Sequence, residues 1–274
     1  MKSNEMTEHW TVLAGTKSCV QGILRMAAIR RNTQIGDIRI HSVHAGAGSP
    51  VVLLHGLSGS HNWWRYTVPA LSKRYAVHIP ELVGFGRSRG RGSHPGIPEM
   101  AQLMTSWLAA IGVNRPHLVG HSMGGQIAVH MIAAGLEVRT LTLVCASGLP
   151  RDLGVRAAAR MVGGALPPRG WGALEFLPTM ALDALRAGPT RLVRASWQLL
   201  TDDVTPMLSR VRCPALVVWG ALDPLVPLAH GEQFARALPD ARLVVISDAA
   251  HNVMADRPAE FNPVLLNFLD SHNA

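Results

Sequence analysis

The segment around Ser122 constrains the fold more than any other part of the chain. A short apolar run at residues 117–119 leads into the pentapeptide Gly-His-Ser-Met-Gly at 120–124, and residues 126–134 follow without glycine or proline. This order predicts a strand, a sharp turn and a helix. In such a turn the serine hydroxyl stands above the end of the strand, and the helix N-terminus behind it favours negative charge. We therefore predict that Ser122 is a nucleophile.

A second copy of the pattern serves as an internal comparison. Residues 86–90 read Gly-Arg-Ser-Arg-Gly, but Gly92, Pro95 and Gly96 follow closely. Glycine and proline at this density prevent a helix from starting behind Ser88. We interpret Ser88 as a loop residue.

The composition is typical of a globular protein with a well-filled core. Hydrophobic residues make up 48% of the 274 residues and charged residues 16%, which argues against disorder. No apolar run approaches the roughly 20 residues that span a bilayer, and Arg25 interrupts the apolar run at 20–29, unlike a signal peptide. Cys19, Cys145 and Cys213 are widely spaced, as reduced core thiols are. We expect a cytoplasmic protein without a membrane span.

The net charge of +8 is spread along the chain rather than gathered in a stripe. The densest basic cluster is Arg87, Arg89 and Arg91, and no aromatic residues interleave with these arginines. Surfaces that bind single-stranded nucleic acid combine basic groups with stacking aromatics. We therefore expect a solvated basic surface and no nucleic-acid partner.

Strand-like and helix-like runs alternate along most of the chain. The predicted strands, besides the one before Ser122, lie at 51–54, 76–79, 140–144, 215–219 and 242–246. The predicted helices, besides the one after Ser122, include a run with Trp63 and Trp64 and the segments at 98–111, 231–237 and 258–269. This alternation predicts an α/β fold with a mostly parallel central sheet flanked by helices.

Two regions depart from this alternation, one at the N-terminus and one after residue 147. Residues 1–31 are predicted to form an N-terminal arm with a short helix at 20–31, and the strands flanking Gly36-Asp37 are predicted to form a hairpin. Residues 148–208 lack a convincing strand but contain helical patches at 156–162 and 191–200. We predict a core of residues 32–147 and 209–274, with residues 148–208 inserted before the last two strands as a helical lid.

A serine hydroxyl needs a base, and the base needs a carboxylate to orient it. Asp223 follows the predicted strand at 215–219, and His251 follows the one at 242–246. The carboxyl ends of parallel strands meet at one edge of a sheet, so both side chains are expected beside Ser122. Weaker candidates for the acid are Asp202, Asp203 and Asp248. His121 adjoins Ser122 but is expected to point away from it.

A tetrahedral intermediate also needs hydrogen-bond donors for its oxyanion. The backbone N–H of Met123, after the nucleophile, is one candidate, and that of Leu57, on the loop after the strand at 51–54, is the other. His55 and Gly56 are interpreted as residues that form and brace this loop. His117 and His121 have a spacing seen at metal sites, but the turn between strand and helix separates them, so we predict no metal site.

These motifs resemble those of the α/β-hydrolase superfamily, over about residues 33–269. The resemblance rests on His-Gly-Leu at 55–57, Gly-His-Ser-Met-Gly at 120–124, Asp223 and His251. The chain is similar to lidded bacterial esterases, cofactor-free haloperoxidase-like perhydrolases and meta-cleavage-product C–C hydrolases, which implies a Ser-His-Asp triad and no cofactor. Glu81 departs from the pattern, because these relatives usually carry aspartate at that position.

The resemblance narrows the reaction. Related dehalogenases and epoxide hydrolases carry aspartate at the position of Ser122, and related hydroxynitrile lyases use a lysine near the acid, whereas no lysine follows Lys73. We expect hydrolysis of carboxylic esters of hydrophobic small molecules. The alternatives are C–C bond hydrolysis, perhydrolysis, and a small-molecule receptor built on the same fold. The oligomeric state stays open.

The substrate pocket is predicted from large apolar residues near the expected site. The tryptophans considered are Trp63, Trp64, Trp171 and Trp197. The alternative for each is that it packs the lid or the core and touches no ligand.

Overall fold

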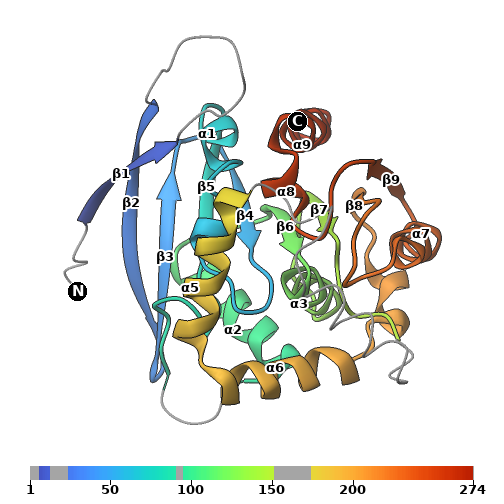
Figure 1. The fold of residues 1–274 in the computed structure, drawn as a ribbon, viewed down its shortest axis with the longest axis horizontal. Helices are drawn as coiled ribbons and strands as arrows, with labels where there is room; N and C mark the ends of the chain where they lie inside the picture. Colours follow the sequence, from blue (N-terminus) through green and yellow to red (C-terminus); the bar gives the residue numbers. More distant parts are fainter. Residues whose placement is uncertain (1–5, 13–23, 91–94, 151–173, 274) are drawn as a thin grey trace.

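The computed structural model describes residues 6–12, 24–90, 95–150 and 174–273. Its centre is a nine-stranded sheet in the order β1-β2-β3-β5-β4-β6-β7-β8-β9 (Figure 1). Strands β4 to β9 run parallel to one another, and β1 to β3 form an antiparallel extension at one side. The bounds are β1 Met6–Val12, β2 Leu24–Ile35, β3 Ile38–Ala45, β4 Ser49–Leu54, β5 Tyr75–Pro80, β6 His117–His121, β7 Thr140–Val144, β8 Ala215–Gly220 and β9 Ala241–Ile246.

The central strands are buried because helices cover both faces of the sheet. Every residue of β6, β7 and β8 is buried, whereas β9 at the edge is only partly so. Such strands read as continuous apolar runs rather than as an alternation, which explains why the sequence identified them. Helices α2 (Ile97–Ala110) and α3 (Met123–Ala133) pack together, as do α1 (Val68–Leu71) and α9 (Pro258–Asp270), while α7 (Leu228–Ala237) packs on β8 and β9 (Figure 1).

The N-terminal region differs from the prediction. The short helix expected at 20–31 is wrong over its described part, because β2 begins at Leu24 and continues past the proposed boundary at residue 31. Strand β2 pairs with β3 through the predicted hairpin, and β1 pairs with β2. Strand β3 has unpaired backbone groups along its outer edge unless another strand covers it. That requirement outweighs the weak helical periodicity of residues 20–31.

The helix expected around Trp63 and Trp64 is shorter than predicted. A single 3₁₀ turn, η1, spans His61–Trp64, and α1 begins only at Val68. The side chain of Ser60 caps the turn by accepting a hydrogen bond from the backbone N–H of Asn62 at 3.3 Å.

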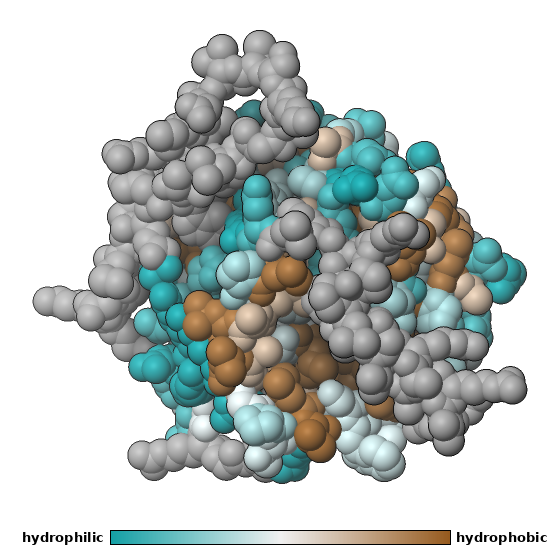
Figure 2. All heavy atoms as spheres, viewed as in Figure 1, coloured by the Kyte–Doolittle hydropathy of each residue, from teal (hydrophilic) through white to brown (hydrophobic). Residues whose placement is uncertain are grey.

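Residues 148–208, called the insertion below, lie between β7 and β8. The described part contains η2 (Leu174–Phe176), α5 (Leu177–Ala187), α6 (Pro189–Thr201) and η3 (Thr205–Arg210), so the patch predicted at 191–200 is helical. The patch predicted at 156–162 lies outside the described residues. Figure 2, in the same view as Figure 1, shows hydrophobic groups on the face of the molecule that carries α5 and α6. The exposed large hydrophobic side chains on these two helices are Leu182, Leu185, Val193 and Trp197. No helix in the described part of the chain has the length and apolar character that a membrane crossing requires.

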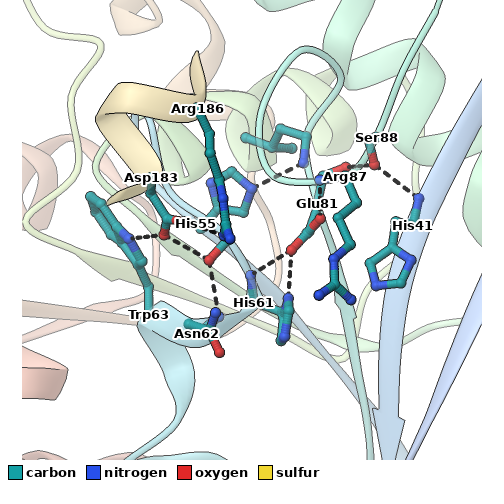
Figure 3. A network of polar contacts seen from close by, with 12 residues as sticks. His41, His55, His61, Asn62, Trp63, Glu81, Arg87, Ser88, Asp183 and Arg186 are labelled. Carbon is teal, nitrogen blue, oxygen red and sulfur yellow. Dashed lines mark hydrogen bonds and ion pairs between the residues drawn. The ribbon is translucent and has the colours of Figure 1, made fainter. Parts of the chain in front are cut away.

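Glu81 organises the loop that follows β5. Its carboxylate is buried and lies 2.5 Å from His61 Nδ1, and it also accepts the backbone N–H of Arg87 (Figure 3). A hydrogen on His61 Nδ1 therefore points to Glu81. The Glu81 side chain thereby links this loop to η1.

Ser88 belongs to the same loop and has a structural role. Its hydroxyl donates to the carbonyl of Glu81 at 2.6 Å and accepts the backbone N–H of His41 at 2.9 Å. The side chain is fully buried. These contacts agree with the interpretation of Ser88 as a loop residue.

The Glu81 contacts predict a pH-dependent stability. Burial raises the pKa of Glu81, but hydrogen bonding and charge interaction with His61 outweigh it and hold the pKa at about 2, below its ordinary value of 4.5. A carboxyl whose pKa is lower in the folded state stabilises the protein above the unfolded pKa and loses that contribution as the pH falls towards the folded pKa. The excess unfolding free energy of wild type over Glu81→Gln should shrink by about 1 to 2 kcal/mol between pH 5 and pH 3.

Urea unfolding at a series of pH values measures this difference. Glu137→Gln is the matched control, because its side chain is 82% exposed and exposed ion pairs contribute little. A gap between wild type and Glu81→Gln that stays constant over this pH range would contradict the prediction.

Candidate active site

Ser122 occupies the tight turn between β6 and α3. Its backbone has φ 51° and ψ −118°, a conformation that non-glycine residues rarely adopt. The backbone N–H of Ser122 donates to the carbonyl of Val144 at 3.0 Å, which ties the turn to β7. A Cβ at Gly120 would lie 2.4 Å from the carbonyl oxygen of Gly124. The two glycines of the motif are therefore required by close backbone packing.

The predicted acid and base are hydrogen-bonded to each other. His251 Nδ1 lies 2.8 Å from Asp223 Oδ2, while Asp223 Oδ1 accepts the backbone N–H groups of Leu225 and Val226 at 2.8 and 2.9 Å. Burial raises the pKa of Asp223, but the charge and hydrogen bond of His251 outweigh it and keep the pKa below its ordinary value. The carboxylate accepts a hydrogen bond from the Nδ1–H of His251, which leaves the lone pair of the ring on Nε2, where a base would need it.

The loop after β4 lies against Ser122, the predicted nucleophile. A Cβ at Gly56 would come within 3.0 Å of Ser122 Cβ, so Gly56 permits the close approach that brings the Leu57 backbone to the site. The His55 ring braces the loop, because its Nε2 accepts the N–H of Leu82 at 3.0 Å and its Nδ1 donates to the Gly56 carbonyl at 2.8 Å. Burial lowers the pKa of His55 to about 4, so the ring is neutral at pH 7.

The second predicted oxyanion donor belongs to Met123, the first residue of α3. The first N–H groups of a helix have no acceptor within the helix and point out of its N-terminus. The Met123 N–H is therefore placed as the predicted oxyanion donor requires.

His121 has a role that sequence reasoning missed. Its ring packs on that of His251 with centroids 4.8 Å apart, and its Nε2 donates to the backbone carbonyl of His251 at 3.0 Å. Burial first, and then the neighbouring His251, lower the pKa of His121 to about 3. A neutral ring thus supports the loop of the base. The sequence signal that could have revealed this role is the position of His121 directly before Ser122, at the end of β6, where its ring meets the loop after β9.

Asp256 supports the same loop from the other side. It belongs to none of the predicted motifs, yet its Oδ2 accepts a hydrogen bond from the backbone N–H of Ala250 at 2.9 Å. Burial raises the pKa of this carboxyl to about 6. Nothing in the sequence pattern distinguishes this residue from other aspartates near a helix.

Within the described residues, two clusters bring side chains of metal-binding type together. His41, His61 and Glu81 form one, and Cys145, Asp223 and His251 form the other, with their ligand-type atoms within 4.8 Å of one another. Ligands that share a zinc ion lie roughly 3.3 Å apart, because the bonds are about 2.0 Å long and tetrahedral. The His61–Glu81 and His251–Asp223 contacts, at 2.5 and 2.8 Å, have hydrogen-bond lengths instead. Each pair is arranged to share a proton.

The four tryptophans predicted for the pocket occupy different environments. Trp63 is 4% exposed, and its ring lies 5.6 Å from that of His121 and 5.8 Å from that of Phe176. Trp64 is fully buried in the core, and Trp197 is 64% exposed. Trp171 lies outside the described residues. Of these rings, Trp63 is the one for which a ring contact with His121, beside the candidate triad, is observed in the described part of the chain.

Comparison with known proteins identifies the family of the chain. Residues 51–264 match the model of the alpha/beta hydrolase family. A putative carbamate hydrolase RutD from Azorhizobium caulinodans is 32% identical over 255 residues, covering 85% of this chain and 96% of that protein. A 2-hydroxy-6-oxo-6-phenylhexa-2,4-dienoate hydrolase from Burkholderia cepacia is 27% identical over 268 residues, covering 86% and 92%.

A solved structure agrees at the level of the fold. A thermophilic esterase from Thermogutta terrifontis superposes with a TM-score of 0.77 at 24% identity, covering 89% of this chain and 99% of that one. Since the family model spans well over half of the chain and a relative above 30% identity is matched over nearly its full length, the chain belongs to the α/β-hydrolase family.

Proposed function

We propose that this protein is a serine hydrolase that cleaves carboxylic esters of hydrophobic small molecules through an acyl-enzyme intermediate. The observation that carries the proposal is the 2.8 Å hydrogen bond between His251 Nδ1 and Asp223 Oδ2, at the sheet edge where Ser122 holds its left-handed turn. A serine nucleophile, a histidine base and an orienting carboxylate are the groups that acyl transfer to water requires. This chemistry needs no cofactor.

In the proposed mechanism His251 Nε2 accepts the Ser122 hydroxyl proton as Oγ attacks the ester carbonyl carbon. The carbonyl oxygen becomes an oxyanion that the N–H groups of Leu57 and Met123 stabilise. The tetrahedral intermediate then expels the alcohol, which takes the proton from His251, and the acyl group stays on Ser122. A water molecule, deprotonated by His251, releases the acid and restores the hydroxyl. Asp223 remains ionised and stabilises the imidazolium that forms in each half.

We further propose that the insertion acts as a lid over this site and that Trp63 and Phe176 contribute an apolar wall. Both rings are buried, Trp63 beside His121 and Phe176 against Trp63, and neither offers a charged group to a substrate. Carbamate hydrolysis is a second candidate, favoured by the relative that is 32% identical. The carbonyl of a carbamate can be attacked by the same nucleophile, so the candidates differ in the leaving group.

Replacing the nucleophile tests the covalent route. Ser122→Ala should lower ester turnover by about 10⁴-fold or more with unchanged stability, because it removes the acyl-enzyme. A fluorophosphonate probe should label Ser122 in the wild type and nothing in the variant. Ser271→Ala, at an exposed serine after α9, is the control. Labelling of the peptide that contains Ser88, or full turnover by Ser122→Ala, would refute the assignment.

Replacing the acid tests the partner of the base. Asp223→Asn keeps the size of the side chain but no longer stabilises a protonated His251, and kcat should fall by about 10³- to 10⁴-fold. Asp202→Asn is the matched control, since Asp202 accepts from His130 at 2.8 Å and from Gln126 at 2.6 Å, away from the triad. Steady-state kinetics on one aryl ester measures both. Equal losses in the two variants would show that Asp223 is not the specific partner.

The acyl chain tests the apolar wall. Each additional buried CH₂ contributes up to about 0.8 kcal/mol, so kcat/KM should rise several-fold per carbon from p-nitrophenyl acetate through butyrate and hexanoate until the pocket fills. An aryl carbamate and a vinylogous 1,5-diketone, assayed alongside, decide among ester, carbamate and C–C hydrolysis by their relative kcat/KM. A steady fall from acetate onwards would contradict the hydrophobic pocket. Absence of turnover of every substrate would favour a receptor.

A further inference from the structure

Asp183 is a charged residue type in an unusual position. It lies on α5 of the insertion, between Leu182 and Leu185, which are 47% and 79% exposed, yet its own side chain is 1% exposed. It points from α5 towards the loop that follows Leu57 (Figure 3). An ionised carboxylate placed away from water costs several kcal/mol unless polar groups replace its hydration. The neighbours of Asp183 therefore identify what it does.

Two hydrogen bonds end on the same oxygen of Asp183. Oδ2 accepts the hydroxyl of Ser60 at 2.7 Å and the indole N–H of Trp63 at 3.1 Å (Figure 3). Arg186 offers a weaker ion pair at 3.8 Å, from a side chain that is 49% exposed. Burial raises the pKa of Asp183, while the bonds from Ser60 and Trp63 act in the opposite direction. The carboxylate therefore accepts hydrogen bonds from two donors that belong to the core, Ser60 and Trp63.

These donors connect the insertion to the candidate triad. The Trp63 ring, held at its N–H by Asp183, packs on His121, and His121 in turn packs on His251 and bonds its backbone. Helix α5 also reaches the base loop directly, because Asn252 Nδ2 donates to Met180 Sδ at 3.5 Å. One helix therefore contacts both the loop after the oxyanion donor Leu57 and the residue after the base.

We propose that Asp183 is a positioning residue that seats α5 on the active site and fixes the orientation of Trp63, so that acyl groups meet a formed pocket wall. The proposal rests on the proposed function. It predicts that Asp183 affects binding of the acyl chain more than the chemical step. A residue that served packing alone would be better as a hydrophobic side chain, since a buried carboxylate offers no advantage there.

The test compares Asp183→Ala, Asp183→Asn and Trp63→Phe. Asp183→Ala leaves two buried donors unpaired, and KM for p-nitrophenyl hexanoate should rise about tenfold while kcat changes less. Asp183→Asn should restore most of this loss, because one amide oxygen can accept both hydrogen bonds. Trp63→Phe removes the N–H and keeps a ring, so adding it to Asp183→Ala should raise KM little further.

The matched control lies on the same helix. Thr179 accepts a hydrogen bond from Arg65 at 2.9 Å, which also ties α5 to the core but does not involve Trp63. Thr179→Ala should leave KM within about twofold of wild type, an expected loss of one partly exposed hydrogen bond. Hydrogen exchange of residues 177–187 should be faster in Asp183→Ala than in Thr179→Ala.

The outcomes are distinct. A higher KM, rescued by asparagine and accompanied by faster exchange of α5, supports the proposal. Faster exchange with an unchanged KM would overturn it, because Asp183 would then only hold the helix, and so would equal effects of Asp183→Ala and Thr179→Ala. If the wild type hydrolysed none of the substrates, the proposed function alone would fail. In that case hydrogen exchange would test whether Asp183 seats α5, and unchanged exchange of residues 177–187 in Asp183→Ala would refute it.

Discussion

The backbone of Ser122 holds a conformation that costs an L-residue about 1 to 3 kcal/mol, and the surrounding elements have to maintain it. Two features do so. The Ser122 N–H is bound to Val144 on the neighbouring strand, and its carbonyl accepts the N–H of Gly125 in the first turn of α3 at 3.0 Å. Strand β6 and helix α3 then pack so closely that a Cβ at Gly120 would overlap the backbone of Gly124.

Several polar groups are buried together at this edge of the sheet, and their charge states explain how they coexist there. Asp223 keeps its charge because a ring nitrogen and two backbone amides replace its water. His55 and His121, equally buried, have pKa values lowered by burial and are neutral at pH 7. Neutral rings brace the loops without adding positive charge that would compete with His251 for the carboxylate. Asp223 is the carboxylate that is hydrogen-bonded to the His251 ring, and the buried neutral histidines beside it add no competing positive charge.

Sequence reasoning located the parts of the molecule that follow from local patterns. The buried strands read as apolar runs, and the order of Ser122, Asp223 and His251 along the chain places each after a strand of the parallel sheet. The region of residues 20–31 was misjudged, because a short segment with mixed periodicity takes the structure that its neighbour requires, here pairing with β3.

Contacts between residues far apart in sequence were beyond prediction for a different reason. His61 meets Glu81 across 20 residues, Gln126 meets Asp202 across 76 and Ser60 meets Asp183 across 123. No local pattern identifies the partner of any of these residues, and each acquires it only when the insertion and the loops are packed on the sheet. Asp183 illustrates this point, because an aspartate between leucines on an amphipathic helix would ordinarily be assigned to the solvent side.

Relatives that carry out different reactions share this fold, so the triad alone cannot set the bond that is cleaved. The matched proteins include a putative carbamate hydrolase and a hydrolase of a 2-hydroxy-6-oxo-dienoate. Discrimination has to come from groups around the acyl chain and the leaving group. The proposed apolar wall of Trp63 and Phe176 would separate substrates by up to about 0.8 kcal/mol for each buried CH₂, whereas a buried polar group aimed at the substrate rejects a molecule without the matching partner by about 10⁴-fold or more. The Trp63 N–H already has its partner in Asp183, so in the proposed pocket this ring would offer an apolar surface. Selectivity at the proposed wall would therefore be graded by size rather than set by a single hydrogen bond.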